Sequence, residues 1–139
     1  ALLVVSEDIV DKCNLEPIVK IKSMSVVGTD PVLMLSGPIP ATKKALEQAK
    51  LKPEDINLVE INEAFSSVVG AWRKEFPEID YENVNANGGS IAIGHPLGAT
   101  GARLMTNLIH EMKRNNYKYG LQAICEGGGT ANATIVELV

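Results

Sequence analysis

A mixed, mostly parallel sheet with helices on both faces, within the α/β class, is the fold that the sequence predicts. Apolar runs typical of buried strands alternate with amphipathic helical segments, and the segments between them are rich in glycine and proline. Strands separated by helices favour parallel pairing, whereas the last two strands follow each other directly and favour an antiparallel hairpin. The 139 residues suffice for one domain, 1–139, with its own core.

The first elements follow a strand, helix, strand order. Residues 1–5 form an apolar run that predicts a buried strand, and Ser6 can cap a short helix that ends near Asn14. Apolar and polar residues alternate over 18–26, as expected for a second strand. Since a buried strand seldom opens a chain, we also expect that this chain is part of a longer one.

The middle of the chain predicts a loop and two helices around a short strand. Residues 28–40 contain three prolines and two glycines, which predict an ordered loop. A helix should begin at Ala41, and the apolar run 56–61 should form a strand. The next helix should end at Pro77, and its apolar face is predicted to comprise Phe65, Val68, Val69, Trp72 and Phe76.

The last third combines a glycine-rich stretch, a helix and two strands. Residues 85–101 contain five glycines and lead into a helix. The following helix has an apolar stripe made by Leu104, Leu108 and Met112. Residues 121–125 and 131–139 then read as the two strands of the hairpin.

The composition gives no support for a nucleic-acid or membrane partner. Thirteen Lys and Arg residues are outnumbered by seventeen Asp and Glu residues, so the net charge is −4 and no basic surface is expected. No apolar stretch is long enough to span a bilayer. Cys13 and Cys125 lack the spacing of a zinc site, so we expect no metal and a reducing compartment, which is the cytoplasm or else an organelle matrix.

The first candidate site segment is Asn62–Phe65, which follows a predicted strand and opens a predicted helix. Asn62 is well placed to accept hydrogen bonds from the free amides of the helix start, and Glu63 gains there from the helix dipole. Taken alone, the segment indicates helix capping rather than catalysis. In α/β folds, however, sites are commonly built where strands end.

The second candidate segment is the glycine-rich run 87–103, with His95 near its centre. Gly89 and Gly94 have the spacing of a phosphate-binding loop, but His95 and Pro96 stand where that loop needs Lys and Ser or Thr. The dinucleotide pattern GxGxxG is absent as well. A histidine held between glycine and proline, in a backbone that allows close approach, is instead a candidate for proton transfer.

The third candidate segment is Cys125–Gly129, at the end of an apolar strand. A free cysteine there is commonly a core residue. The three glycines after Glu126 change this reading, because they expose successive backbone N–H groups that suit an oxyanion hole. Cys125 could then donate or accept a proton beside that hole.

These three segments contain the motifs Asn-Glu-Ala-Phe, Gly-His-Pro and Cys-x-Gly-Gly-Gly, in this order. With this set of motifs, the sequence resembles the thiolase family. The resemblance extends from Ala1 to Val139, includes the loop Gly37–Pro40, and covers the C-terminal half of the family only. It implies a layered thiolase-like domain whose N-terminal half, with the nucleophilic cysteine, is absent from this sequence. Glu126 departs from the family, which commonly has an apolar residue there.

The resemblance implies a role for each motif residue. His95 would accept the nucleophile's proton and help bind the thioester oxygen, and Cys125 would exchange a proton with the substrate α-carbon. The backbone N–H of Gly127 would serve the second oxyanion hole, and Asn62 would orient a water in the first. Ala64 and Phe65 would line the pantetheine path.

The implied activity is cleavage of 3-ketoacyl-CoA or condensation of acetyl-CoA, and the isolated chain would be inactive. CoA thioesters would be substrates, without a further cofactor. The N-terminal thiolase half would be the partner, in an enzyme that forms homo-oligomers. A non-catalytic acyl-CoA-binding or dimerisation module is the alternative, and a nucleotide-binding domain is disfavoured by His95 and Pro96.

Overall fold

The computed structural model describes residues 1–139 and contains one sheet of four strands, in the order β1-β4-β3-β2. The strands are β1 (Val19–Gly28), β2 (Leu58–Ile61), β3 (Tyr119–Cys125) and β4 (Thr130–Leu138). The helices are α1 (Glu7–Cys13), α2 (Pro38–Ala49), α3 (Ser66–Glu75), α4 (Gly89–Ile93) and α5 (Thr100–Asn115). Single 3-10 turns are η1 (Pro53–Asp55), η2 (Tyr81–Asn83) and η3 (Gly127–Gly129).

The α/β class and the mixed sheet are confirmed, but the pairing is less parallel than expected. β2 pairs with β3 in parallel, while β4 pairs antiparallel with both β3 and β1. β1, β2 and β3 therefore run in the same direction, as strands linked through helices should. The hairpin strand β4 lies between β1 and β3, so two of the three pairings are antiparallel.

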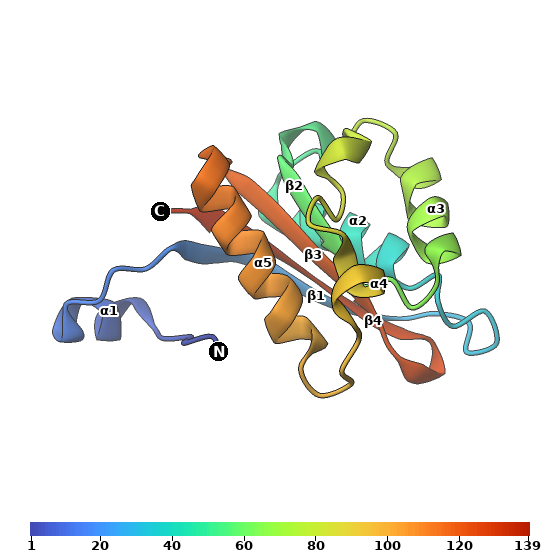
Figure 1. The fold of residues 1–139 in the computed structure, drawn as a ribbon, viewed down its shortest axis with the longest axis horizontal. Helices are drawn as coiled ribbons and strands as arrows, with labels where there is room; N and C mark the ends of the chain where they lie inside the picture. The colour runs from blue at the N-terminus through green and yellow to red at the C-terminus, as the bar shows by residue number, and fades with distance from the viewer.

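Helices cover both faces of the sheet, as predicted. Figure 1 shows α5 crossing one face, with α2 on the other. On the α2 face, the main core joins side chains of α2 and α3 to those of β2, β3 and β4, and the buried indole N–H of Trp72 donates to Thr42 Oγ1 at 3.0 Å. On the α5 face, a smaller cluster comprises Leu58, Leu108, Met112 and Val136.

Close contact between α5 and β3 depends on Gly120. A Cβ atom at this position would stand 2.4 Å from Sδ of Met112 and 3.1 Å from Cδ1 of Leu108, and both side chains are fully buried. A larger residue would therefore force the buried side chains of Met112 and Leu108 to move. The packing places the start of α5, which follows the His95 loop, beside the end of β3.

The structure corrects the prediction for residues 1–5. They pair with no strand, and Leu3 and Val4 are 77% and 72% exposed. An apolar run becomes a buried strand only where a neighbouring strand and a core receive it. Figure 1 shows this segment and α1 extending away from the sheet.

Two helix boundaries also differ from the predictions. α2 begins at Pro38 instead of Ala41, because a proline is well tolerated in the first turn, where its missing N–H has no partner. α3 begins at Ser66, so Phe65 precedes it and is 64% exposed instead of lying on its apolar face. The glycine-rich stretch contains the five-residue helix α4, which was not predicted.

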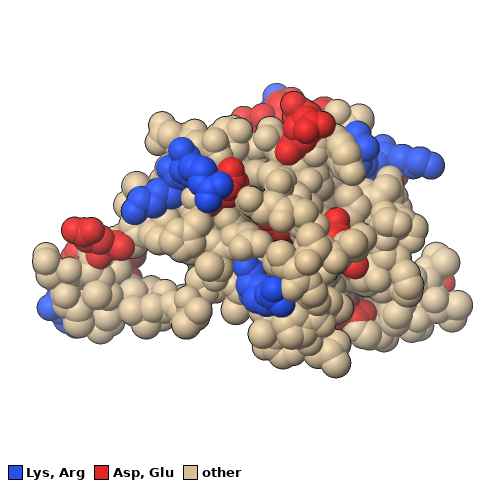
Figure 2. Space-filling view, in the orientation of Figure 1, with Lys and Arg blue, Asp and Glu red and all other residues tan.

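The surface carries charges of both signs. On the face drawn in Figure 2, Lys and Arg side chains form separate small groups between those of Asp and Glu, with a wide uncharged area around them. The mixed pattern fits the net charge of −4. Among the helices, none is both long and apolar enough to cross a membrane.

Candidate active site

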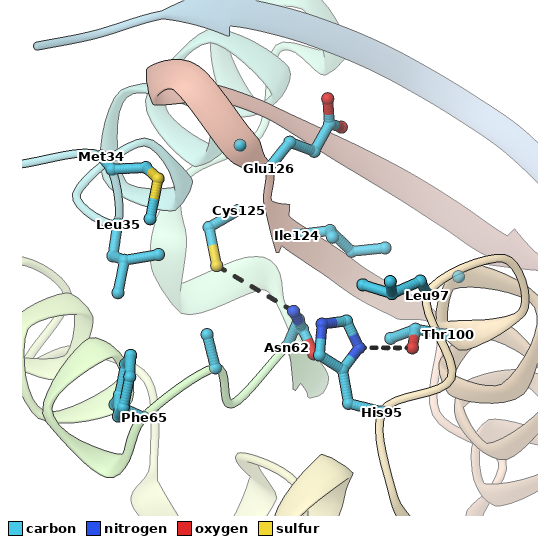
Figure 3. A pocket seen from close by; sticks show the side chains of 13 residues that line it. Met34, Leu35, Asn62, Phe65, His95, Leu97, Thr100, Ile124, Cys125 and Glu126 are labelled. Carbon is cyan, nitrogen blue, oxygen red and sulfur yellow. Dashed lines mark hydrogen bonds between the residues drawn. The ribbon is translucent and has the colours of Figure 1, made fainter. Parts of the chain in front are cut away.

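All six residues predicted from the motifs line one pocket of about 520 Å³. Asn62, Ala64 and Phe65 come from the segment after β2, His95 from the loop before α5, and Cys125 and Gly127 from the end of β3 and the turn after it. Figure 3 shows the labelled side chains of Asn62, Phe65, His95 and Cys125 around the same space, with Met34 and Leu35 on one side and Leu97 and Thr100 on the other. The sheet thus brings three distant motifs together.

The parallel pairing of β2 and β3 explains why two of the motifs meet. Ile61 pairs with Ala123, so the carboxyl ends of both strands lie at the same edge of the sheet. Beyond the strand, the backbone N–H of Asn62 donates to the carbonyl of Ala123 at 2.9 Å. Asn62 and Cys125 therefore follow neighbouring strand ends and face each other.

The side chain of Asn62 is buried and oriented by Ser90. The Ser90 hydroxyl donates to Oδ1 of Asn62 at 2.9 Å, and Ser90 is itself buried at the start of α4. Nδ2 of Asn62 is thereby directed to Sγ of Cys125, at 4.0 Å (Figure 3). Asn62 lies four residues before α3, so the predicted capping role of Asn62 is wrong.

Glu63 and Asn85 hold α4 against the end of β2. One carboxylate oxygen of Glu63 accepts from Nδ2 of Asn85 at 2.9 Å, and the other accepts from the backbone N–H of Ile91 at 2.8 Å. The Asn85 side chain also bonds both the N–H and the carbonyl of Ile61. This network fixes the helix that carries Ser90. Glu63 therefore has a positioning role that was not predicted from its place in the motif.

His95 is fixed by the start of α5. Its Nδ1 lies 2.6 Å from Oγ1 of Thr100, a buried residue at the first position of the helix. Before His95, Gly94 has a φ of 88°, which only glycine adopts readily, and the Arg103 side chain bonds the carbonyl of Ile93. The histidine is therefore held from both sides of the loop.

Cys125 is a buried thiol, 7% exposed, at the end of β3. Burial raises the pKa of this thiol above its usual value, and the negative charge of Glu126 acts in the same direction. Hydrogen bonds from its own backbone, Asn62 and Ala64 oppose the rise in the pKa only in part. Cys125 therefore carries its proton at neutral pH and can act as an acid.

The turn after Cys125 depends on two glycines in the left-handed region. Gly128 and Gly129 have φ values of 73° and 83°, and a Cβ on Gly129 would stand 2.7 Å from the carbonyl oxygen of Thr29. The Glu126 carboxylate accepts from the side chains of Thr130 and Asn132 across the turn. The backbone of Gly127 is thereby kept at the edge of the pocket.

Glu60 is a buried carboxylate beside the site network. It is 1% exposed, and its Oε2 has no hydrogen-bond partner. Burial, and then the negative charges of Glu63 and Glu111, raise its pKa from 4.5 to about 7. Since the pKa is higher in the folded state, the folded chain holds this proton more tightly, and stability falls as the pH rises from about 4.5 to about 7.

Replacing Glu60 with glutamine is expected to stabilise the protein at pH 8 but hardly at pH 4. The rise in the pKa of Glu60 corresponds to about 3 kcal/mol of folding free energy, which the protein loses when this carboxyl ionises above pH 7. Glutamine does not ionise, so the variant would not lose this free energy. Urea unfolding of both proteins at the two pH values measures the difference. Glu78→Gln, at an exposed site, is the matched control, and an equal effect of Glu60→Gln at pH 4 and pH 8 would refute the assignment.

Cys13 does not contribute to the pocket. It is the last residue of α1 and is exposed, whereas Cys125 is buried in the site. Cys13 is also not among the residues that line the pocket. The pocket therefore contains a single thiol, that of Cys125.

Three residues that hold the predicted ones were not predicted from the sequence: Ser90, Thr100 and Asn85. Serine and threonine near the start of a helix are common, so their type gives no signal. The one available signal was position, because Thr100 follows His95 by five residues and Ser90 precedes His95 by five residues. Asn85 gave no signal, since its partners lie more than twenty residues away.

Comparison with known proteins identifies relatives of one kind. A family model described as the C-terminal domain of thiolase matches residues 15–138. The steroid 3-ketoacyl-CoA thiolase FadA6 of Mycobacterium tuberculosis is 54% identical over 99% of the chain, and an acetyl-CoA acetyltransferase of Syntrophomonas wolfei is 45% identical over 99%. The crystal structure of a human mitochondrial 3-ketoacyl-CoA thiolase in complex with CoA superposes with a TM-score of 0.92 at 41% identity, over 96% of the chain.

These relatives are much longer than the chain. The chain spans 33% of the Mycobacterium tuberculosis enzyme, 35% of the Syntrophomonas wolfei enzyme and 34% of the human chain. The similarity therefore concerns about a third of each relative.

Proposed function

The chain belongs to the thiolase family, as its C-terminal domain, and we propose that it supplies the acid/base half of a thiolase active site. The observation that carries the proposal is the convergence of His95, Cys125 and Asn62 on one pocket from three separate segments. A domain that only bound CoA would not need a buried thiol, an imidazole and a fixed amide around the same space.

The proposed substrates are CoA thioesters, in line with the names of the relatives. Cleavage of a 3-ketoacyl-CoA by CoA, and the reverse condensation of two acetyl-CoA molecules, both need proton transfer next to a thioester carbonyl. They also need donors that stabilise negative charge on oxygen. No further cofactor is proposed, and a cytoplasmic location stays a prediction.

His95 is proposed as the base that activates the nucleophile. In the family, a cysteine of the N-terminal half attacks the carbonyl carbon of the substrate. As its S–H bond breaks, the proton passes to the imidazole and the electron pair forms the new C–S bond, while the carbonyl π pair moves onto oxygen. When the carbonyl re-forms in cleavage, the bond from this carbon to the α-carbon breaks, and its electron pair leaves as the enolate of acetyl-CoA. The protonated imidazole then donates a hydrogen bond to the thioester oxygen.

Cys125 is proposed as the group that exchanges a proton with the α-carbon. In cleavage, its S–H protonates the enolate of acetyl-CoA, and in condensation its thiolate removes that proton. The raised pKa of the thiol favours the protonated form, which is the form required for cleavage. Its buried position also keeps bulk water from the enolate.

Two groups are proposed as the oxyanion donors. The backbone N–H of Gly127, at the edge of the pocket, would stabilise the tetrahedral intermediate at the nucleophile. Asn62, oriented by Ser90, would hold a water at the enolate oxygen. Ala64 and the exposed ring of Phe65 would line the path of the pantetheine arm.

The proposed partners are the N-terminal half with its nucleophile and, within the complete enzyme, further copies of the chain. Cys13 lies outside the pocket, so it is unsuited to replace the nucleophile. Apolar side chains that line the pocket remain uncovered, since Leu97 and Phe65 are 92% and 64% exposed. Exposed apolar groups of this kind favour a surface that another polypeptide covers.

Binding of a CoA thioester tests the substrate class directly. Calorimetric titration with acetyl-CoA is expected to give saturable binding that weakens in a Phe65→Ala variant, while titration with NAD should give no binding. Leu3→Ala, an exposed apolar residue of the N-terminal arm, is the matched control. Binding of NAD without binding of acetyl-CoA would contradict the proposal and favour a nucleotide site.

A further inference from the structure

Thr100 lies between the imidazole of His95 and the carbonyl of Pro96. Its Oγ1 is 2.6 Å from Nδ1 of His95 and 2.9 Å from the carbonyl oxygen of Pro96. Thr100 is 3% exposed, so bulk water does not compete for these contacts. Both contacts are within hydrogen-bond distance, yet the hydroxyl has only one proton to donate.

The carbonyl of Pro96 determines where that proton goes. A carbonyl oxygen cannot donate, so two oxygens at 2.9 Å attract each other only when the hydroxyl proton lies between them. The same carbonyl accepts the backbone N–H groups of Ala99 and Thr100, each at 2.9 Å, which fixes its position at the start of α5. The Thr100 hydroxyl is therefore the donor to Pro96.

The contact with His95 must then run in the opposite direction. Since the hydroxyl proton is engaged, Oγ1 offers a lone pair to the ring, and Nδ1 of His95 must carry the hydrogen. A neutral imidazole has one N–H, so Nε2 has a free lone pair. Figure 3 shows the second ring nitrogen of His95 directed to the side of Asn62 and Cys125.

We propose that Thr100 is a positioning residue that fixes His95 in the Nδ1–H tautomer and so makes Nε2 the proton acceptor of the site. The proposal deepens the proposed function, on which the role of the acceptor rests. When the nucleophile's S–H bond breaks, the proton moves to Nε2 and the electron pair stays on sulfur. Nδ1–H keeps its bond to Thr100 in both protonation states, so the hydroxyl needs no rotation.

Without the contact to Thr100, His95 would favour the tautomer that cannot accept a proton at Nε2. An imidazole free in water favours the proton on Nε2, which would leave that nitrogen unable to accept another. A hydroxyl that accepts from Nδ1 reverses this preference. A net hydrogen bond of ordinary strength shifts such an equilibrium about two- to tenfold.

Nitrogen-15 NMR of labelled histidine tests the proposal without any assay of activity. The sequence has two histidines, and His110, which is exposed on α5, serves as the internal control. Above the usual pH range of imidazole protonation, His95 is expected to show the hydrogen on Nδ1 and His110 the hydrogen on Nε2. Thr100→Val should return His95 to the Nε2–H form, and Thr100→Ser, which keeps the hydroxyl, should retain Nδ1–H.

The outcomes separate this proposal from the proposed function. An Nε2–H tautomer in the unmodified protein, or an unchanged Nδ1–H tautomer in a folded Thr100→Val variant, would overturn the role of Thr100. If Thr100→Val does not fold, the unmodified and Thr100→Ser spectra still decide the question. An Nδ1–H tautomer in a chain that gives no thiolase turnover when it is combined with a thiolase N-terminal half would instead count against the proposed function alone.

Discussion

Replacing His95 with alanine is expected to lower the rate of acyl transfer about 10²- to 10⁴-fold in an enzyme that joins this chain to a nucleophile-bearing N-terminal half. The imidazole, which lines the pocket, is the proposed acceptor of the nucleophile's proton, and alanine removes that acceptor. The rate is measured as exchange of labelled CoA into acetyl-CoA, because this exchange requires attack by the nucleophile and no proton transfer at carbon.

The other histidine provides the control for this prediction. His110 lies on the exposed side of α5, so His110→Ala should leave the exchange unchanged. An exchange rate in His95→Ala within a few-fold of the unmodified enzyme would show that another group accepts the proton.

Replacing Cys125 with alanine is expected to abolish proton exchange at the α-carbon of acetyl-CoA while sparing exchange of CoA. The thiol is the proposed carrier of the α-proton, and its loss should reduce deuterium uptake from heavy water about 10²- to 10⁴-fold. Mass spectrometry of recovered acetyl-CoA measures that uptake. The two variants therefore separate two steps that a single overall rate would merge.

Cys13→Ala is the matched control for Cys125, because Cys13 is an exposed thiol at the end of α1. It should leave both exchange reactions intact. The raised pKa of Cys125 adds a dependence on pH: the cleavage direction needs the S–H form, so it should persist into the alkaline range until the thiol loses its proton. Rapid deuterium uptake in Cys125→Ala would assign the proton transfer to a different group.

The fold class could be predicted because its evidence is local in the sequence. Periodicity located β3, β4 and α5, and direct succession of two strands predicted their antiparallel hairpin. The order of the strands could not be predicted in this way, since the insertion of β4 between β1 and β3 depends on contacts between residues more than a hundred positions apart. The prediction of a strand at residues 1–5 was wrong for a related reason, because an apolar run does not reveal whether a partner strand exists.

In the candidate site, too, some residues could be predicted from local sequence and others depend on contacts in the folded chain. The motif residues Asn62, His95 and Cys125 could be found because each stands at an unusual chain position, after a strand or among glycines. Ser90 and Thr100 could not, because a hydroxyl in a helix is ordinary until a partner is placed beside it. The residues proposed to do chemistry could be identified in the sequence, and those that orient them could be identified only in the structure.

The central claim is that this chain carries the acid/base residues of a thiolase site whose nucleophile lies in another segment. Cleavage of acetoacetyl-CoA by CoA, measured for the chain alone and for the chain combined with a thiolase N-terminal half, tests it most directly. We expect no cleavage by the chain alone and restored cleavage in the combination, lost again with His95→Ala. Cleavage by the pure chain that depends on His95, or a folded combination that binds acetyl-CoA without any turnover, would contradict the account.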